Sequence, residues 1–132
     1  MASKWYINEQ YLKLYPVCRW SQPAVVAYLD LQNKYGFHFN EIDKITINTF
    51  HEAKRLEKNH PKTTEEAQYS LPHPLAVALI FGKIGAEEVS IEYINNSKVA
   101  NLREKINVCE KTKYNNLFPG KRFADAEIKL KN

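Results

Sequence analysis

The segment from Leu71 to Phe81 constrains the fold most, because it is apolar nearly all the way round a helix. Ser70 can cap its first turn with a side-chain acceptor. The two prolines of the segment fall in the opening turn, where a missing N–H group leaves no helical hydrogen bond unmade. Gly82 follows and can adopt the left-handed conformation that ends a helix. A helix without a polar face must be enclosed, so we predict a helix over residues 71–82 at the centre of the fold.

A second helix is predicted from Pro23 to Tyr35. Proline suits its first turn, Ser21 can accept an N–H bond at its start, and Gly36 can supply a left-handed stop. The apolar residues on one face form a wide stripe made of Ala24, Tyr28, Leu31 and Tyr35. Such a stripe is typical of a helix packed on a sheet.

Three segments have the features of strands. Residues 44–49 are rich in β-branched side chains, and Ile106 with Val108 marks a second strand. Residues 124–131 alternate strictly between apolar and charged side chains, which predicts a strand with one face in water. Short helices are expected at 51–58 and 97–103.

Other segments are less regular. Residues 62–68 predict a polar loop or single turn, and residues 89–93 alternate like a strand but could also form a short helix or an irregular link. Residues 4–15 predict an extended arm or an irregular strand. The chain of 132 residues is long enough for one core. The expected fold is a single α+β domain, 1–132, with a small mostly antiparallel sheet packed against helices 23–35 and 71–82.

Composition narrows the functional classes. The formal charge is +4, but lysines alternate with carboxylates along the chain, which argues against a nucleic-acid partner. No apolar run is long enough to span or anchor in a membrane, and Cys18 and Cys109 have no CxxC spacing. These features predict a soluble cytoplasmic protein with free thiols. The four histidines show no HxxxH or HExxH pattern, so no metal site is expected.

Two segments, residues 15–23 and 67–74, open the two main helices and are rich in polar groups. A helix N-terminus presents unpaired N–H groups and a partial positive charge, which hold carboxylates, and Arg19 could add a bidentate contact. The plainer interpretation has Ser21 and Ser70 as helix caps and Arg19 in a surface ion pair. Spacing alone favours the plainer interpretation.

His73 and Cys18 are the two side chains that could take a direct part in a reaction. His73 lies beside a helix start, where an imidazole could act as acid or base, although a capping or solvent-facing histidine is more common. Cys18 could act as a nucleophile only with a base beside it, and a buried inert thiol is the more frequent case.

The two segments are YPVCRWSQPAVVAYL and AQYSLPHPLAVALIFGKIG. They resemble the YPxCRxxHP-like and AQFSLPY-like stretches of the MmgE/PrpD family. Residues 41–47, 61–63 and 105–108 also fit the family pattern in order, so the resemblance covers nearly the whole chain. It is specific to the small C-terminal α+β domain of that family.

The resemblance implies a lyase-type function near carboxylates. The family includes the 2-methylcitrate dehydratases of propionate metabolism, cis-aconitate decarboxylases and an iminodisuccinate epimerase, which require neither metal nor organic cofactor. A large helical domain supplies most of their acid and base residues. This chain resembles only the smaller domain, so the helical domain is expected to be absent from it. The small-domain sequence cannot choose among these reactions, and it leaves open whether the chain is an enzyme by itself.

The resemblance also implies roles for individual residues. Substrate carboxylates would be oriented by Arg19, Ser21, Gln22, Gln68 and Ser70, and His73 would be the candidate catalytic group. Gln22 stands where many members have a histidine, and a glutamine exchanges no proton at neutral pH. His73 stands where a tyrosine is usual, which keeps a protonatable group.

Two hypotheses about the partners follow. In the first, the domain binds a small tricarboxylate or dicarboxylate and works with a helical partner domain. In the alternative, the chain is a non-catalytic, self-associating module or a gene remnant that forms dimers or larger homo-oligomers.

Overall fold

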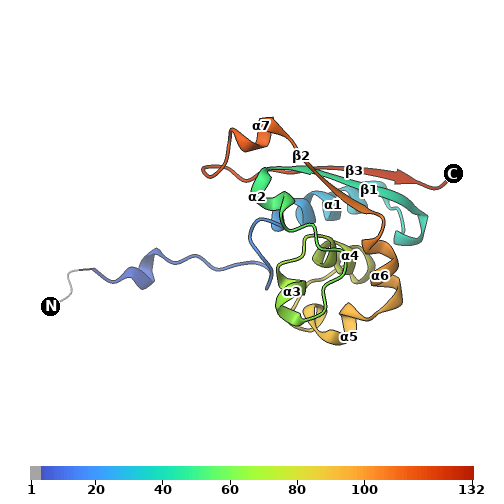
Figure 1. Cartoon of the computed structure of the whole chain (residues 1–132), viewed down its shortest axis with the longest axis horizontal. Helices are drawn as coiled ribbons and strands as arrows, with labels where there is room; N and C mark the ends of the chain where they lie inside the picture. The colour runs from blue at the N-terminus through green and yellow to red at the C-terminus, as the bar shows by residue number, and fades with distance from the viewer. Residues whose placement is uncertain (1–3) are drawn as a thin grey trace.

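Strand β1 (Ile42–Thr49) is the centre of a three-stranded sheet, with β2 (Ile106–Glu110) on one side and β3 (Asp125–Leu130) on the other. The computed structural model describes residues 4–132 and is drawn in Figure 1. β1 pairs with β2 in parallel and with β3 in the longer, antiparallel ladder. All three predicted strands are present, and the prediction of an α+β fold is confirmed.

The two long helices pack against each other beneath the sheet. α1 (Gln22–Tyr35) ends at Gly36 and α4 (Pro72–Phe81) at Gly82, and both glycines are left-handed, with φ of 67° and 71°. The predicted bounds of both helices are therefore correct to within one residue. Pro72 through Leu79 are all buried, so the all-apolar helix is enclosed as expected.

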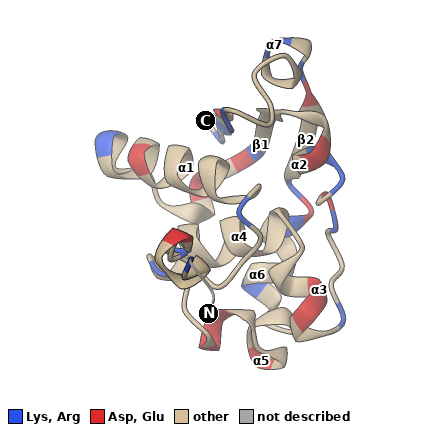
Figure 2. Ribbon diagram, turned by 90° about the vertical axis from the view of Figure 1, so that its left-hand side faces the viewer, with Lys and Arg blue, Asp and Glu red and all other residues tan. Residues whose placement is uncertain are grey.

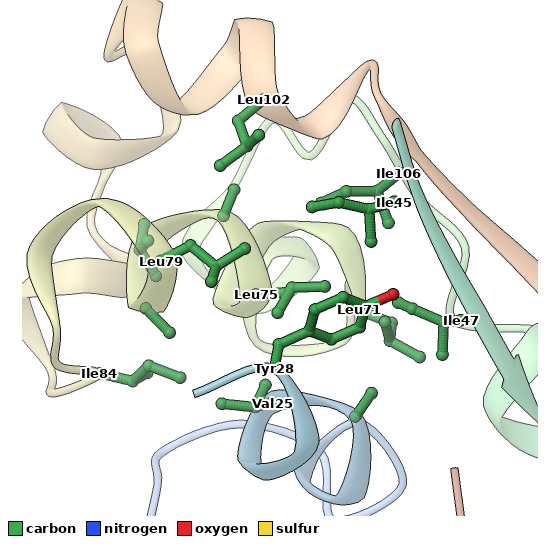
Figure 3. Close-up of a cluster of buried hydrophobic side chains, with 14 of the residues drawn as sticks. Val25, Tyr28, Ile45, Ile47, Leu71, Leu75, Leu79, Ile84, Leu102 and Ile106 are labelled. Carbon is green, nitrogen blue, oxygen red and sulfur yellow. The ribbon is translucent and has the colours of Figure 1, made fainter. Parts of the chain in front are cut away.

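The core lies between α1, α4 and one face of the sheet (Figure 3). Ile45 and Ile47 of β1 point into it, opposite Leu75 of α4. Tyr28 of α1 is fully buried, and its hydroxyl donates to the carbonyl oxygens of Thr46 (2.6 Å) and Glu127 (3.2 Å). Burial raises the pKa of that hydroxyl above its ordinary value. One side chain thus joins the helix to two strands.

Short elements fill the remaining chain. The α-helices are α2 (His51–Lys54), α3 (Thr64–Gln68), α5 (Ile91–Ile94), α6 (Ser97–Arg103) and α7 (Thr112–Asn115), and the 3₁₀ turns are η1 (Tyr6–Glu9), η2 (Phe39–Glu41) and η3 (Glu87–Val89). The open question over residues 89–93 is settled, because Val89 ends η3 and residues 91–93 belong to α5.

The helix predicted over 51–58 is wrong in its length, since α2 ends at Lys54. The amides of Leu56 and Glu57 donate to carbonyl oxygens only three residues back (both 3.0 Å), and the Lys58 amide donates to the carbonyl oxygen of Leu56 (2.8 Å), so the α-helical hydrogen bonds stop after Arg55.

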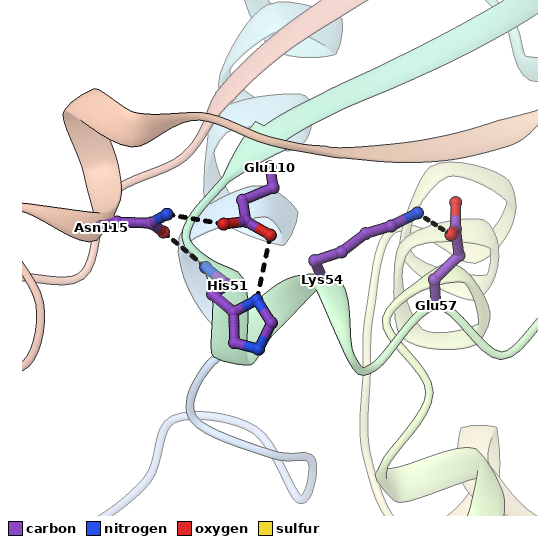
Figure 4. Close-up of polar contacts among 5 residues, drawn as sticks. All are labelled: His51, Lys54, Glu57, Glu110 and Asn115. Atoms are coloured by element: carbon purple, nitrogen blue, oxygen red, sulfur yellow. Dashed lines mark hydrogen bonds and ion pairs between the residues drawn. The ribbon is translucent and has the colours of Figure 1, made fainter.

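The start of α2 is tied to the far end of β2 by a small polar cluster (Figure 4). The Asn115 side chain accepts the His51 amide (2.7 Å) and donates to Glu110 (2.7 Å), and the His51 ring lies 3.0 Å from the same carboxylate. Hydrogen bonds from His51 and Asn115 hold the pKa of Glu110 below its usual value. The cluster is exposed and holds the loops at that end of the sheet.

Two surface features complete the fold. Residues 4–15 extend away from the body as the predicted arm, with η1 as its one helical turn (Figure 1). Basic and acidic residues are spread over the same elements, as on α1 with Asp30 and Lys34 (Figure 2). No helix within residues 4–132 is long and apolar enough to cross a membrane. Both cysteines are free thiols.

Candidate anion-binding site

The structure brings the two helix-opening segments together. The amide of Cys18 donates to the carbonyl oxygen of Gln68 at 2.8 Å, although the two residues are 50 positions apart. Residues 15–23 and 67–74 therefore lie side by side. The side chain of Gln68 is half-buried at the end of α3.

Ser70 is a helix cap. It is fully buried, its hydroxyl donates to the carbonyl oxygen of Lys58 (2.7 Å), and it accepts the amide of His73 (3.0 Å). The contacts of Ser70 are thus those of a helix cap, as in the plainer of the two interpretations. No part of its side chain reaches the surface.

His73 is fully buried as well, with both ring nitrogens engaged. Nε2 lies 2.8 Å from the carbonyl oxygen of Glu88, and Nδ1 lies 3.0 Å from Nη1 of Arg103. A carbonyl oxygen only accepts and a guanidinium only donates, so Nε2 carries the proton and Nδ1 accepts. Burial, aided by the neighbouring Arg103 charge, lowers the pKa of His73 from 6.5 to about 4. A catalytic role for His73 stays a prediction, and this enclosure weighs against it.

Arg103 was not singled out from the sequence. Its guanidinium is buried at the end of α6, donates to His73 and to the carbonyl oxygen of Ile94 (3.0 Å), and forms no ion pair within residues 4–132. In the sequence, its position four residues after the inward-facing Val99, on the same face of the helix, was a sign of burial. Arg103 and His73 together form a structural polar pair inside the domain.

Ser21 does not act as the predicted helix cap. It is fully buried, and its hydroxyl donates to the carbonyl oxygen of Cys18 (2.7 Å) instead of accepting an N–H group of α1. The cap prediction for Ser21 is therefore wrong, because the preceding turn takes up the hydroxyl. Ser21 was also predicted to contact substrate, but its side chain does not line the hollow described below.

Arg19 and Gln22 remain at the surface and line one hollow at the start of α1. The hollow encloses about 430 Å³, and its walls come from Arg19, Gln22, Pro23, Val26, Gly120 and Arg122. Arg122 lies in the loop before β3, over one hundred positions from Arg19, and nothing in the sequence pattern marked it. The fold thus adds a second arginine to the two predicted binding residues.

The charge of this hollow is uncompensated. The Arg19 guanidinium stacks 4.2 Å from the centre of the Tyr11 ring, and the Arg122 guanidinium lies 5.8 Å from the centre of the Phe118 ring. In the described part of the chain neither guanidinium forms an ion pair, and no carboxylate lines the hollow. The amino end of α1 adds further partial positive charge. The surroundings therefore favour an anion.

Among the described residues, the side chains that line the hollow could hold an anion but include no acid or base for catalysis. Its charged lining groups are two guanidinium groups, which stay protonated, and its amide side chain exchanges no proton at neutral pH. The Gln22 amide donates weakly to the carbonyl oxygens of Tyr15 and Val17, both at 3.4 Å. In residues 4–132 no three His, Cys, Asp or Glu side chains lie close enough together to hold a metal ion.

Fold and hollow together define a small α+β domain with a cationic pocket at a helix start. The family model described as the MmgE/PrpD C-terminal domain matches residues 15–132. The chain belongs to this family, as the resemblance of the two helix-opening segments predicted. Comparison with curated proteins finds no match.

Proposed function

We propose that this chain is the carboxylate-binding small domain of a 2-methylcitrate dehydratase-like lyase system. Its ligand is a small di- or tricarboxylate, held by Arg19, Gln22 and Arg122. The observation that carries the proposal is the presence of two arginines without carboxylate partners in one hollow at the start of α1. Arg19, Gln22, Pro23 and Val26, which line the hollow, lie in the first segment that resembles the family.

Charge and geometry support this ligand class. A guanidinium donates two parallel N–H bonds to one carboxylate, so two arginines can engage two carboxylates of a single molecule. Tyr11 and Phe118 lie against these guanidinium groups and limit their freedom. A monocarboxylate satisfies one arginine and should bind more weakly.

The proposal includes a partner. No described residue that lines the hollow can transfer a proton, so the acid and base of a lyase reaction would come from a helical domain that closes over it. In this scheme the domain binds and orients the substrate in the cytoplasm, and chemistry begins only in the assembled pair. Its own residues fix the carboxylates, and the partner's residues move the proton.

Isothermal titration of the full chain at neutral pH and low salt tests the binding step. The ligands are 2-methylcitrate, citrate and cis-aconitate, with acetate as a monocarboxylate. We expect saturable heat with the first three and a large loss of affinity in Arg19→Ala and in Arg122→Ala. Loss of one charge-assisted contact corresponds to about tenfold or more in affinity.

The matched control is Arg55→Ala, which removes an exposed arginine from a different surface. This variant should bind like the unchanged chain, because Arg55 does not line the hollow. If Arg55→Ala and Arg19→Ala lost the same affinity, the loss would come from the change in net charge and not from the hollow. No heat with any polycarboxylate, from folded protein, would overturn the proposed binding role.

A further inference from the structure

A second hollow lies between the turn η2 and the end of α6, and it shares no lining residue with the anion-binding hollow. It encloses about 480 Å³, and its lining includes Phe39, Asn40, Lys98, Asn101, Leu102 and Lys105. We call it the lysine hollow. Pockets for small molecules enclose roughly 300–1,000 Å³, so its volume is that of a small-molecule site.

One wall of the lysine hollow comes from a single face of α6 and the turn that follows it. Lys98, Asn101, Leu102 and Lys105 recur at intervals of three and four residues, which places them on the same side of a helix. Leu102 is buried, whereas Lys98 and Asn101 are exposed. This face therefore gives the hollow an apolar floor, an amide group and two ammonium groups.

The backbone holds two of the ammonium groups in place. Nζ of Lys105 donates to the carbonyl oxygen of Ile42 (2.5 Å), and Nζ of Lys131, which also lines the hollow, donates to the carbonyl oxygen of Asn40 (2.9 Å). An ammonium group has three N–H donors, so each keeps two for another acceptor. In residues 4–132, none of Lys98, Lys105 and Lys131 forms an ion pair.

The nearby carboxylates do not neutralise these lysines. Glu104 is the one carboxylate among the described residues that line the hollow, and its Oε1 lies 3.5 Å from Nε2 of His60. Asp43, close to Lys105 in the fold, pairs instead with Lys129 at 3.0 Å. Three lysines and one carboxylate leave the lining cationic, so the lysine hollow favours an anion.

The anion that suits this lining differs from the one that suits the anion-binding hollow. An arginine fork matches the two oxygens of a carboxylate, whereas a lysine ammonium is a compact point charge. A phosphoryl group offers three acceptor oxygens, which separate ammonium groups from different parts of the chain can share. Three lysines without an arginine therefore favour a phosphate.

The rest of the lining suits a flat ring with polar edges. Phe39 adds an aromatic ring that is half-buried, and Asn40 and Asn101 each have an amide side chain with donor and acceptor groups. Nucleobases stack on aromatic side chains, and asparagine amides pair with the edges of bases. We propose that the lysine hollow binds a mononucleotide, with its phosphate among the three lysines and its base against Phe39.

Isothermal titration of the full chain with AMP, GMP, CMP and UMP, at neutral pH and low salt, tests the proposal. We expect saturable binding of at least one mononucleotide. Ribose 5-phosphate, which lacks the base, and the matching nucleoside, which lacks the phosphate, should both bind more weakly. Lys98→Ala should weaken the nucleotide about tenfold, because one charge-assisted contact is lost.

Phe39→Leu tests the place of the base separately from that of the phosphate. It should weaken the nucleotide about fivefold or more, which is the effect of losing a stacked ring, and leave the binding of ribose 5-phosphate unchanged. A fold defect in this variant would weaken both ligands. Circular dichroism of every variant establishes that the domain is folded.

Two control variants remove a positive charge elsewhere. Lys62→Ala changes an exposed lysine in the loop before α3, and Arg19→Ala changes the anion-binding hollow. Both should bind the nucleotide like the unchanged chain. A loss in Arg19→Ala without one in Lys98→Ala would place the nucleotide in the anion-binding hollow and overturn the proposal. So would the absence of saturable binding with all four nucleotides, or equal binding of the nucleotide and ribose 5-phosphate.

Discussion

The buried pair of His73 and Arg103 makes the domain sensitive to mild acid. His73 is neutral in the folded chain, with burial as the main cause of its pKa of about 4, against 6.5 for an ordinary histidine. Below pH 6.5 the unfolded chain takes up this proton while the folded chain resists it. Protonation would also place two positive charges 3.0 Å apart, between Nδ1 of His73 and Nη1 of Arg103.

The sign and size of the effect follow from linkage. A group whose pKa is lower in the folded chain contributes stability above the unfolded pKa, and this contribution is lost as pH falls through the folded value. The window therefore runs from 6.5 down to about 4. Each pKa unit corresponds to about 1.4 kcal/mol, so His73 alone should remove about 3 kcal/mol of unfolding free energy by the lower end of this window.

Urea unfolding measured at several pH values across this window is the assay. The comparison variant is His73→Gln, whose amide can donate to the Glu88 carbonyl oxygen and accept from Arg103 but does not titrate. Its stability should change less with pH over the window. Glu110 and Asp125 have carboxylates whose pKa is held low, so their protonation also lowers the stability of the domain as pH falls. This loss is the same in both proteins and cancels in the difference.

His60→Gln is the matched control, because the His60 side chain is 76% exposed. This variant should follow the pH dependence of the unchanged chain. A parallel loss of stability in His73→Gln and the unchanged chain between pH 6.5 and about 4 would refute the proposed role of His73. That result would mean that His73 charges in the folded domain without cost.

Two further substitutions test the core. Tyr28→Phe removes the hydroxyl that bonds the carbonyl oxygens of Thr46 and Glu127, and should lower the unfolding free energy by about 1 kcal/mol in urea titrations; no change would mean that the bond is energetically neutral. Leu75→Ala opens a cavity beside fully buried neighbours and should cost about 2 to 5 kcal/mol, whereas Leu12→Ala, at a position 97% exposed, should cost less than about 0.5 kcal/mol. Similar losses at the two positions would contradict the placement of the core.

The sequence predicted those elements that depend on local patterns. Helix α4 followed from its nearly all-apolar composition, and α1 from its stripe and its terminal glycine. Strand β3 followed from strict alternation. In each case the local preference and the burial in the fold agree, which is why the bounds came out nearly correct. The family motifs were equally local, and the family match confirms them.

Features created by long-range contacts could not be predicted. The length of α2 was wrong because the chain leaves the helix in tight turns after Arg55, at a point where Leu56 bonds Leu71 and Glu57 bonds Val108. Arg122 joins Arg19 only through the return of the chain before β3, and Arg103 meets His73 only through the packing of α6 on α4. The direction of the Ser21 hydroxyl depends on a turn whose geometry no residue pattern specifies. Gln22 and Arg19 line the same hollow because they are near neighbours in sequence.

The position of β1 in the sheet has a consequence for how the chain reaches this fold. β1 is the first strand in sequence, yet it lies in the middle, and its partners begin at residues 106 and 125. Both ladders therefore close long loops, a topology that slows folding because loop entropy is lost before the contacts form. During synthesis, Ile45 and Ile47 are made long before the two strands that pair with β1. Until those strands are made, both edges of β1 lack a strand partner.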